Sequence, residues 1–132
     1  MMKKILLMLT LSTIFLGVST FDVSAAPRAN SSIYTFNAGG DTGVRGSGSF
    51  NGGRADEVNR VYYKFELSRA GIVKDSSSGV KYQANWSVNL RDYEYSNSST
   101  KWTMYSFGRA YLTNGNTKTD QDTTSKYIRA YH

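Results

Sequence analysis

The chain has no cysteine, and its one histidine, His132, is the last residue. Without cysteine there is neither a disulfide nor a thiol nucleophile. A lone histidine at a chain end is not held in the geometry that a general base or a metal site requires. The Ser–His and Cys–His pairs of nucleophilic enzymes are therefore excluded, as are the usual ligand sets for zinc and copper. We expect no catalytic residue, no metal and no cofactor.

The first 25 residues have the three parts of a secretory signal peptide. Two lysines near the start precede an apolar run over residues 5–18, and Val23-Ser24-Ala25 supplies the small residues that signal peptidase recognises. The apolar run is shorter than the ~20 residues needed to cross a bilayer, which favours cleavage after Ala25 over a membrane anchor. The expected organisation is a signal peptide (1–25) followed by one secreted domain (26–132) with no transmembrane segment.

The absence of disulfides indicates which kind of organism the chain comes from, and its net charge indicates which partners it could bind. Secreted domains of animals and fungi often carry disulfides, so an exported chain without them points to a bacterium, and the short leader to a Gram-positive one. Fourteen of the sixteen basic residues and nine of the ten acidic residues follow residue 25, which leaves five excess positive charges. Such a charge suits teichoic acids, anionic lipid headgroups or acidic glycans, or it serves solubility alone.

Alternation of apolar and polar residues indicates β-structure along the secreted part. The alternation is clearest over Val61–Leu67 and Tyr82–Leu90, which predicts strands with one buried and one solvated face. The remaining expected strands are Ser31–Asn37, Lys101–Leu112, Lys126–Tyr131 and, interrupted by Gly46 and Gly48, Val44–Phe50. Alternating glycines in a strand indicate a bulge or a closely approaching neighbour.

Polar segments between these strands predict the connections. Asp75–Gly79 is expected to be a turn between the two clearest strands, and Asn114–Thr124 a mobile loop. The part of the chain after residue 25 has almost no helix-period pattern. The sequence therefore predicts an all-β domain, a small antiparallel β-sandwich or barrel of about six to seven strands.

Aromatic and basic residues alternate on one face of two expected strands. In Lys101–Leu112 this face carries Tyr105, Phe107, Arg109 and Tyr111. The terminal strand carries Tyr127, Arg129 and Tyr131 on one face. If the two strands pair, a Tyr/Phe/Arg surface results that could stack sugar rings, bases or lipid headgroups. The same face could instead stabilise the sheet or pack against a second one. The candidate binding residues are Tyr105, Arg109, Tyr111, Tyr127, Arg129 and Tyr131.

Carboxylates and amides offer two further kinds of chemistry. The carboxylates that could serve a glycosidase are Glu57, Glu66, Asp92 and Glu94, of which the last two are expected in a loop because the strand is expected to end near Arg91. The oxygen side chains that could bind calcium are Asn114, Asn116, Asp120 and Asp122, although the pattern of an EF-hand is missing and a solvated loop is favoured. No RNA-binding fingerprint is present, so we expect no nucleic-acid partner.

In its leader, its short all-β body and its abundance of Tyr, Gly, Ser and Asn, the chain resembles small cysteine-free bacteriocins of the lactococcin 972 type. The resemblance is one of composition. The stretch Ala26–Ser32 lacks the His and Trp that such proteins carry near the mature N-terminus, so it assigns no functional residue.

These observations favour a secreted, non-enzymatic β-domain that binds a cell-envelope polymer, an anionic lipid surface or another extracellular protein, with a bacteriocin-like role among its possible uses. Two further hypotheses stay open. One is an inhibitor of a protease or hydrolase that presents the segments Asp41–Ser49 and Asp75–Val80 as loops. The second is a glycan hydrolase that depends on a carboxylate such as Glu66.

Overall fold

The structure is a computed structural model that describes residues 26–131, so the predicted signal peptide lies outside the described residues. All of the regular structure is antiparallel β-strand. The strands are β1 (Arg28–Ala38), β2 (Asp41–Asn51), β3 (Val58–Arg69), β4 (Ile72–Lys81), β5 (Asn85–Glu94), β6 (Thr100–Leu112) and β7 (Thr117–Ile128). The prediction of an all-β chain with about six to seven strands is confirmed. Across residues 26–131, no helix is long and apolar enough to cross a membrane.

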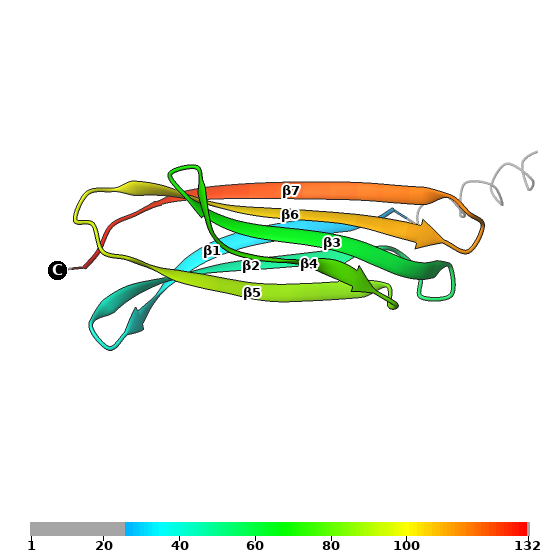
Figure 1. Ribbon diagram of the computed structural model, residues 1–132, viewed down its shortest axis with the longest axis horizontal. Helices are drawn as coiled ribbons and strands as arrows, with labels where there is room; N and C mark the ends of the chain where they lie inside the picture. The colour runs from blue at the N-terminus through cyan, green and yellow to red at the C-terminus, as the bar shows by residue number, and fades with distance from the viewer. Residues whose placement is uncertain (1–25, 132) are drawn as a thin grey trace, which may run out of the picture.

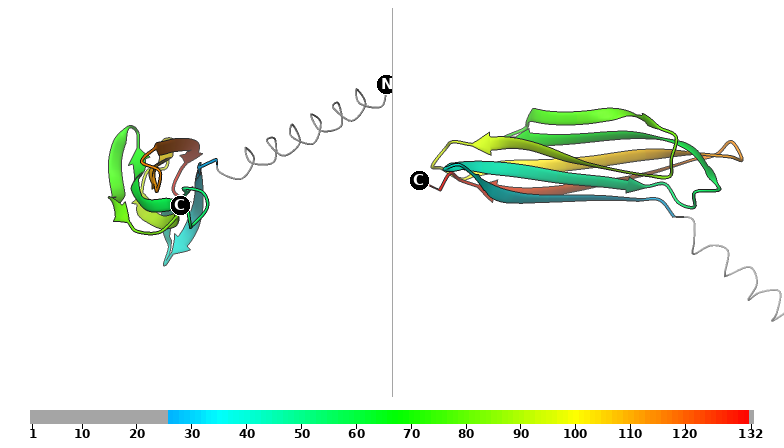
Figure 2. Two further views of the ribbon diagram at one scale, coloured as in Figure 1. Left: turned by 90° about the vertical axis from the view of Figure 1, so that its right-hand side faces the viewer. Right: turned by 90° about the horizontal axis from the view of Figure 1, so that it is seen from below.

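The strands form two sheets. The three-stranded sheet has the order β1-β2-β5, and the four-stranded sheet has the order β4-β3-β6-β7. The two sheets lie face to face as two elongated layers (Figure 1). The end-on view in Figure 2 shows the layers curving toward each other at their edges. Each sheet therefore has one face toward the interior and one toward solvent.

The core lies between the sheets and follows from the alternation seen in the sequence. Val61, Phe65 and Leu67 of β3 are fully buried, and so are Trp102 and Met104 of β6. From the other sheet they meet a smaller set, which includes Val44, Phe50 and Leu90. Each large apolar side chain buried in this way contributes roughly 1.5–3 kcal/mol. In a chain without cysteine, this packing carries the stability of the domain.

Glycines on the inner faces let the sheets approach. A methyl group added at Gly46 would collide with Met104, and one at Gly48 with Phe65. At Gly108 it would overlap the ring of Phe50. The alternating glycines of β2 therefore mark a closely approaching neighbour, which is one of the two interpretations that the sequence offers.

Two strands lie where the sequence predicts turns or loops. Asp75–Gly79 is part of β4, and most of Asn114–Thr124 belongs to β7, so both predictions are wrong. The terminal strand also begins at Thr117 rather than at Lys126. Both strands are edge strands whose side chains are mostly polar and exposed. They therefore lack the alternating apolar residues by which a strand is recognised in a sequence.

β3 and β4 are joined by the two-residue turn Ala70-Gly71. Both residues have positive φ, 50° at Ala70 and 82° at Gly71, and Arg69 pairs with Ile72 across the turn. Two-residue hairpins favour this arrangement because its twist matches that of the strands, and Asn-Gly is the preferred sequence. Ala70 is the only described residue other than glycine with positive φ.

Replacing Ala70 with asparagine is expected to raise the free energy of unfolding by about 0.5–1 kcal/mol, because asparagine tolerates the left-handed region better than alanine does. Urea unfolding measures the change. The matched control is Ala38→Asn, at a strand end where φ is not positive, and no gain is expected there. A gain of equal size in the control would contradict the explanation.

Side chains join the edges of the two sheets. Asp120 Oδ2 of β7 accepts a hydrogen bond from Ala29 N of β1 at 2.8 Å, and Asp122 Oδ2 accepts one from Ser31 N at 2.8 Å. Thr124 Oγ1 donates to Ser31 O at 3.0 Å. Asp120 and Asp122 are thus strand residues bound to backbone, not ligands in a calcium loop. Within the described residues, no group of three or more His, Cys, Asp and Glu side chains could hold a metal ion.

Candidate functional site

The outer face of the four-stranded sheet carries aromatic and charged side chains in regular alternation. The inward residues of β3 and β6 are apolar or small, so their neighbours point to solvent. Pairing of β3 with β6 then sets one charged side chain beside one aromatic ring in four successive pairs: Arg60 with Tyr111, Tyr62 with Arg109, Lys64 with Phe107 and Glu66 with Tyr105. The aromatic–basic face, as we call it here, consists of Arg60, Tyr62, Lys64, Tyr105, Phe107, Arg109 and Tyr111.

Close contacts hold this face in order. The guanidinium carbon of Arg60 lies 4.2 Å from the ring centre of Tyr111, and that of Arg109 lies 5.8 Å from the ring centre of Phe107. The rings of Tyr62 and Phe107 meet edge to face, with their centres 6.3 Å apart. Both guanidinium groups lie within the distance at which a cation is attracted to a ring face. The two guanidinium groups are thereby held beside the rings, and neither makes a hydrogen bond within the described residues.

The charge of this face is positive. Arg60 and Lys64 are exposed, and Arg109 is half-buried among its neighbours. The one acidic residue among the four β3–β6 pairs is Glu66, whose Oε1 lies 3.3 Å from Lys64 Nζ. A flat surface of rings and cations can stack against the apolar faces of sugar or polyol units while it binds phosphate or carboxylate groups.

The structure brings together three of the six predicted binding residues. Tyr105, Arg109 and Tyr111 share the aromatic–basic face. Tyr127 pairs with Lys101 near the other end of β6, and Arg129 and Tyr131 follow the end of β7. The hydroxyl of Tyr131 lies 2.9 Å from Thr35 Oγ1 of the three-stranded sheet. The C-terminal residues lie apart because β7 pairs with β6 through its earlier, threonine-rich part.

Sequence reasoning missed the contribution of β3. Alternation over Val61–Leu67 already places Tyr62 and Lys64 on the solvated side of their strand. Arg60 lies two positions before Tyr62, so the same alternation places it on that side too. What the sequence does not show is that β3 lies beside β6. The neighbour of β6 that completes the face is therefore β3 and not the chain end.

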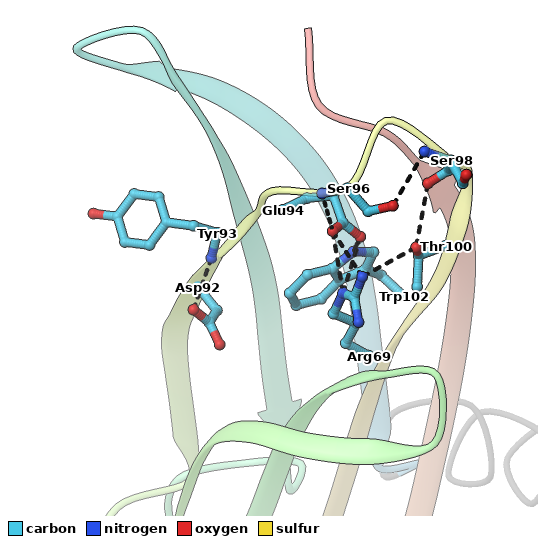
Figure 3. Close-up of polar contacts among 8 residues, drawn as sticks. All are labelled: Arg69, Asp92, Tyr93, Glu94, Ser96, Ser98, Thr100 and Trp102. Carbon is cyan, nitrogen blue, oxygen red and sulfur yellow. Dashed lines mark hydrogen bonds and ion pairs between the residues drawn. The ribbon is translucent and has the colours of Figure 1, made fainter. Parts of the chain in front are cut away.

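Among the candidate carboxylates, Glu94 is buried and is held by hydrogen bonds from neighbouring strands (Figure 3). It lies in β5, which continues past Arg91, and it is only 1% exposed, so the prediction of a loop position is wrong. Arg69 donates to it from Nε at 3.0 Å and from Nη2 at 2.9 Å. Trp102 Nε1 donates at 3.0 Å and Ser96 N at 3.1 Å. The carboxylate therefore joins the ends of β3 and β5 to the start of β6.

These hydrogen bonds determine the charge of Glu94. Burial alone would raise the pKa of its carboxyl, but the donors from Arg69, Ser96 and Trp102 outweigh burial and lower the pKa to about 2. Glu94 is therefore ionised at every pH near neutrality and has its oxygens occupied. A general acid needs a pKa near the working pH, so this geometry suits a clamp and not proton transfer.

The remaining candidate carboxylates and the two predicted inhibitory loops have the following places in the structure. Glu57 lies 3.9 Å from Arg54 in an exposed connection, and Asp92 accepts from the backbone N–H of Tyr93 at 2.8 Å. The segments Asp41–Ser49 and Asp75–Val80, predicted as inhibitory loops, lie within β2 and β4. The prediction that these two segments are loops is therefore wrong.

Comparison with protein-family models finds no match for this chain, and no curated protein matches it.

Proposed function

We propose that the domain is a non-enzymatic binding module that attaches to anionic polymers of the cell envelope through the aromatic–basic face. The observation that carries the proposal is the series of β3–β6 pairs that join a charge to a ring. Cross-strand pairs of this kind also stabilise sheets. Here, however, three of the four pairs contribute a cation, and only Lys64 has an acidic partner, Glu66.

The chemistry of the face fits a wall polymer that alternates phosphate groups with sugar or polyol units, such as a teichoic acid. Guanidinium groups bind phosphate through paired hydrogen bonds, and they lose little freedom because the rings already orient them. Rings between the cations offer apolar surface to the carbon-rich parts of the same polymer. The excess positive charge of the secreted part attracts such a polymer at a distance.

The experiment measures retention of the purified protein on Gram-positive cell walls, with and without their teichoic acids, at low and high salt. Retention is expected on intact walls at low salt and is expected to fall on stripped walls or at high salt, where screening weakens exposed charges. Replacing Arg60 and Arg109 together with glutamine is expected to weaken binding about tenfold, because each exposed contact between a cation and a phosphate contributes roughly 0.5–1 kcal/mol.

The matched control removes two charges elsewhere. Arg28→Gln with Arg129→Gln changes the net charge equally, at exposed positions outside the aromatic–basic face. This variant is expected to keep most of the binding. Equal loss in both double variants would mean that net charge alone attracts the protein to walls, and no retention on intact walls at low salt would remove the proposal.

A further inference from the structure

The outer face of the three-stranded sheet has a different chemistry from the aromatic–basic face. Pairing of β1, β2 and β5 brings small polar side chains into two rows across this sheet, Asn30-Ser49-Ser87 and Ser32-Ser47-Asn89. Neither row contains a charged or apolar side chain. Six neighbouring hydroxyl and amide groups therefore face solvent from three adjacent strands.

This face is hollowed. A depression of about 210 Å³ is lined by all six of these side chains. A second depression, of about 320 Å³, shares Ser49 and Ser87 with the first and continues past Asn85 to Trp86. Together they form a groove on the three-stranded sheet that is polar along the two rows and is bordered at one end by Phe50 and Trp86. A groove that crosses several strands suits a chain-like ligand better than a compact one.

Most hydrogen-bonding groups of the groove have no partner within the described chain. The one bond among the six side chains runs from Ser47 Oγ to Asn89 Oδ1, at 2.6 Å. Asn30, Ser32, Ser49 and Ser87 make no side-chain hydrogen bond within residues 26–131. The groove thus offers both donors and acceptors.

An oriented aromatic ring adjoins the groove. Tyr34 is 40% exposed and follows Ser32 on the same side of β1. Arg45 Nη1 donates to the Tyr34 hydroxyl at 3.3 Å, and the Arg45 guanidinium carbon lies 5.6 Å from the Tyr34 ring centre and 5.3 Å from that of Phe36. The ring is therefore fixed beside the row that contains Ser32, where it can stack against a ligand held in the groove.

We propose that this groove binds a neutral oligosaccharide, with Tyr34 stacked on one sugar ring and the serine and asparagine side chains bonded to hydroxyl and acetamido groups. Sugar hydroxyl groups both donate and accept hydrogen bonds along a chain, which matches an uncharged surface of hydroxyls and amides. This site lies on the opposite sheet from the aromatic–basic face and does not depend on it. The domain would then bind two chemically different components of one envelope.

The experiment titrates ¹⁵N-labelled protein with chitohexaose and, separately, with cellohexaose, and follows the backbone amide signals. Shifts are expected at Ser32, Ser47 and Asn89 and not on the aromatic–basic face. Raising the salt concentration is expected to leave the affinity unchanged, because no ion pair is involved. Salt-insensitive binding separates this site from the anionic-polymer site, so either proposal can fail without the other.

Replacing Tyr34 with alanine is expected to weaken oligosaccharide binding on the order of tenfold, the loss of one ring contact. Its matched control is Tyr127→Ala, which removes an exposed tyrosine, 69% accessible, from the other sheet and is expected to bind normally. Far-UV circular dichroism verifies that both variants are folded. The proposal is wrong if neither sugar shifts the three-stranded sheet, or if Tyr34→Ala binds as well as Tyr127→Ala.

Discussion

Replacing Glu94 with glutamine is expected to lower the free energy of unfolding at neutral pH by about 3 kcal/mol. The carboxyl has a pKa of about 2 in the folded protein, against 4.5 as its ordinary value. Each pKa unit corresponds to ~1.4 kcal/mol, so the lowered pKa means that the folded state favours the charged form of Glu94 by about 3 kcal/mol. Glutamine keeps the size of the side chain but removes the charge that Arg69 and Trp102 bind.

The pH dependence follows from the direction of that shift. Because the pKa is lower in the folded state, the contribution of Glu94 is fully present above pH 4.5 and is lost as the pH falls toward 2. The difference in unfolding free energy between wild type and Glu94→Gln is therefore expected to shrink by about half or more between pH 7 and pH 3. Urea unfolding of both proteins at the two pH values measures it.

Glu66→Gln is the matched control, since it removes one carboxylate from an ion pair whose lysine is exposed. Such pairs contribute roughly 0–1 kcal/mol, so only a small change is expected. If Glu94→Gln were no less stable than Glu66→Gln, or if its deficit were the same at both pH values, the Glu94 clamp would not stabilise the fold through its charge.

Replacing Gly108 with alanine is expected to destabilise the domain by roughly 2–4 kcal/mol, a large part of the stability of a domain this size. The added methyl group would occupy the position of the Phe50 ring, and Phe50 is itself buried between the sheets. The ring is enclosed by the core, so room for the methyl group requires the ring or the strands to shift. Thermal and urea unfolding measure the loss.

Two variants test this explanation. Gly79→Ala changes the same residue type in an edge strand, where the nearest atom would be the Tyr63 hydroxyl at 3.3 Å, and little change is expected. In a Phe50→Leu background the ring is gone, so Gly108→Ala is expected to cost less there than in wild type. Additive losses in the double variant would show that Gly108 acts by another mechanism.

How much of this fold the sequence predicts depends on burial. β3 and β6 each bury one face, so their alternation is strong and their outward residues can be assigned correctly. β4 and β7 are exposed edge strands, and serine and threonine give them no contrast between faces. Tyr82 illustrates the opposite error: it continues the apolar alternation of β5, yet it precedes that strand and is 84% exposed.

Both surfaces depend on pairings that no local pattern reveals. Arg60 and Tyr111 are 51 positions apart in the chain, and only the β3–β6 register brings them together. The groove likewise needs β5 beside β2, which places Asn89 next to Ser47. Sequence periodicity shows which side of a strand a residue occupies, but strand order is decided by the packing of the whole core.

The bonds of Asp120 and Asp122 to β1 join the first strand of the domain to the last, across a separation of 91 residues. Synthesis begins at the N-terminus, so β1 is made first. The N–H groups of Ala29 and Ser31 therefore have no partner until β7, which carries Asp120 and Asp122, has been made. Contacts this distant in sequence form slowly. The domain is therefore complete only when β7 has been made and has joined β1. If the leader directs export, as the sequence predicts, this delay would keep the chain unfolded until it has crossed the membrane.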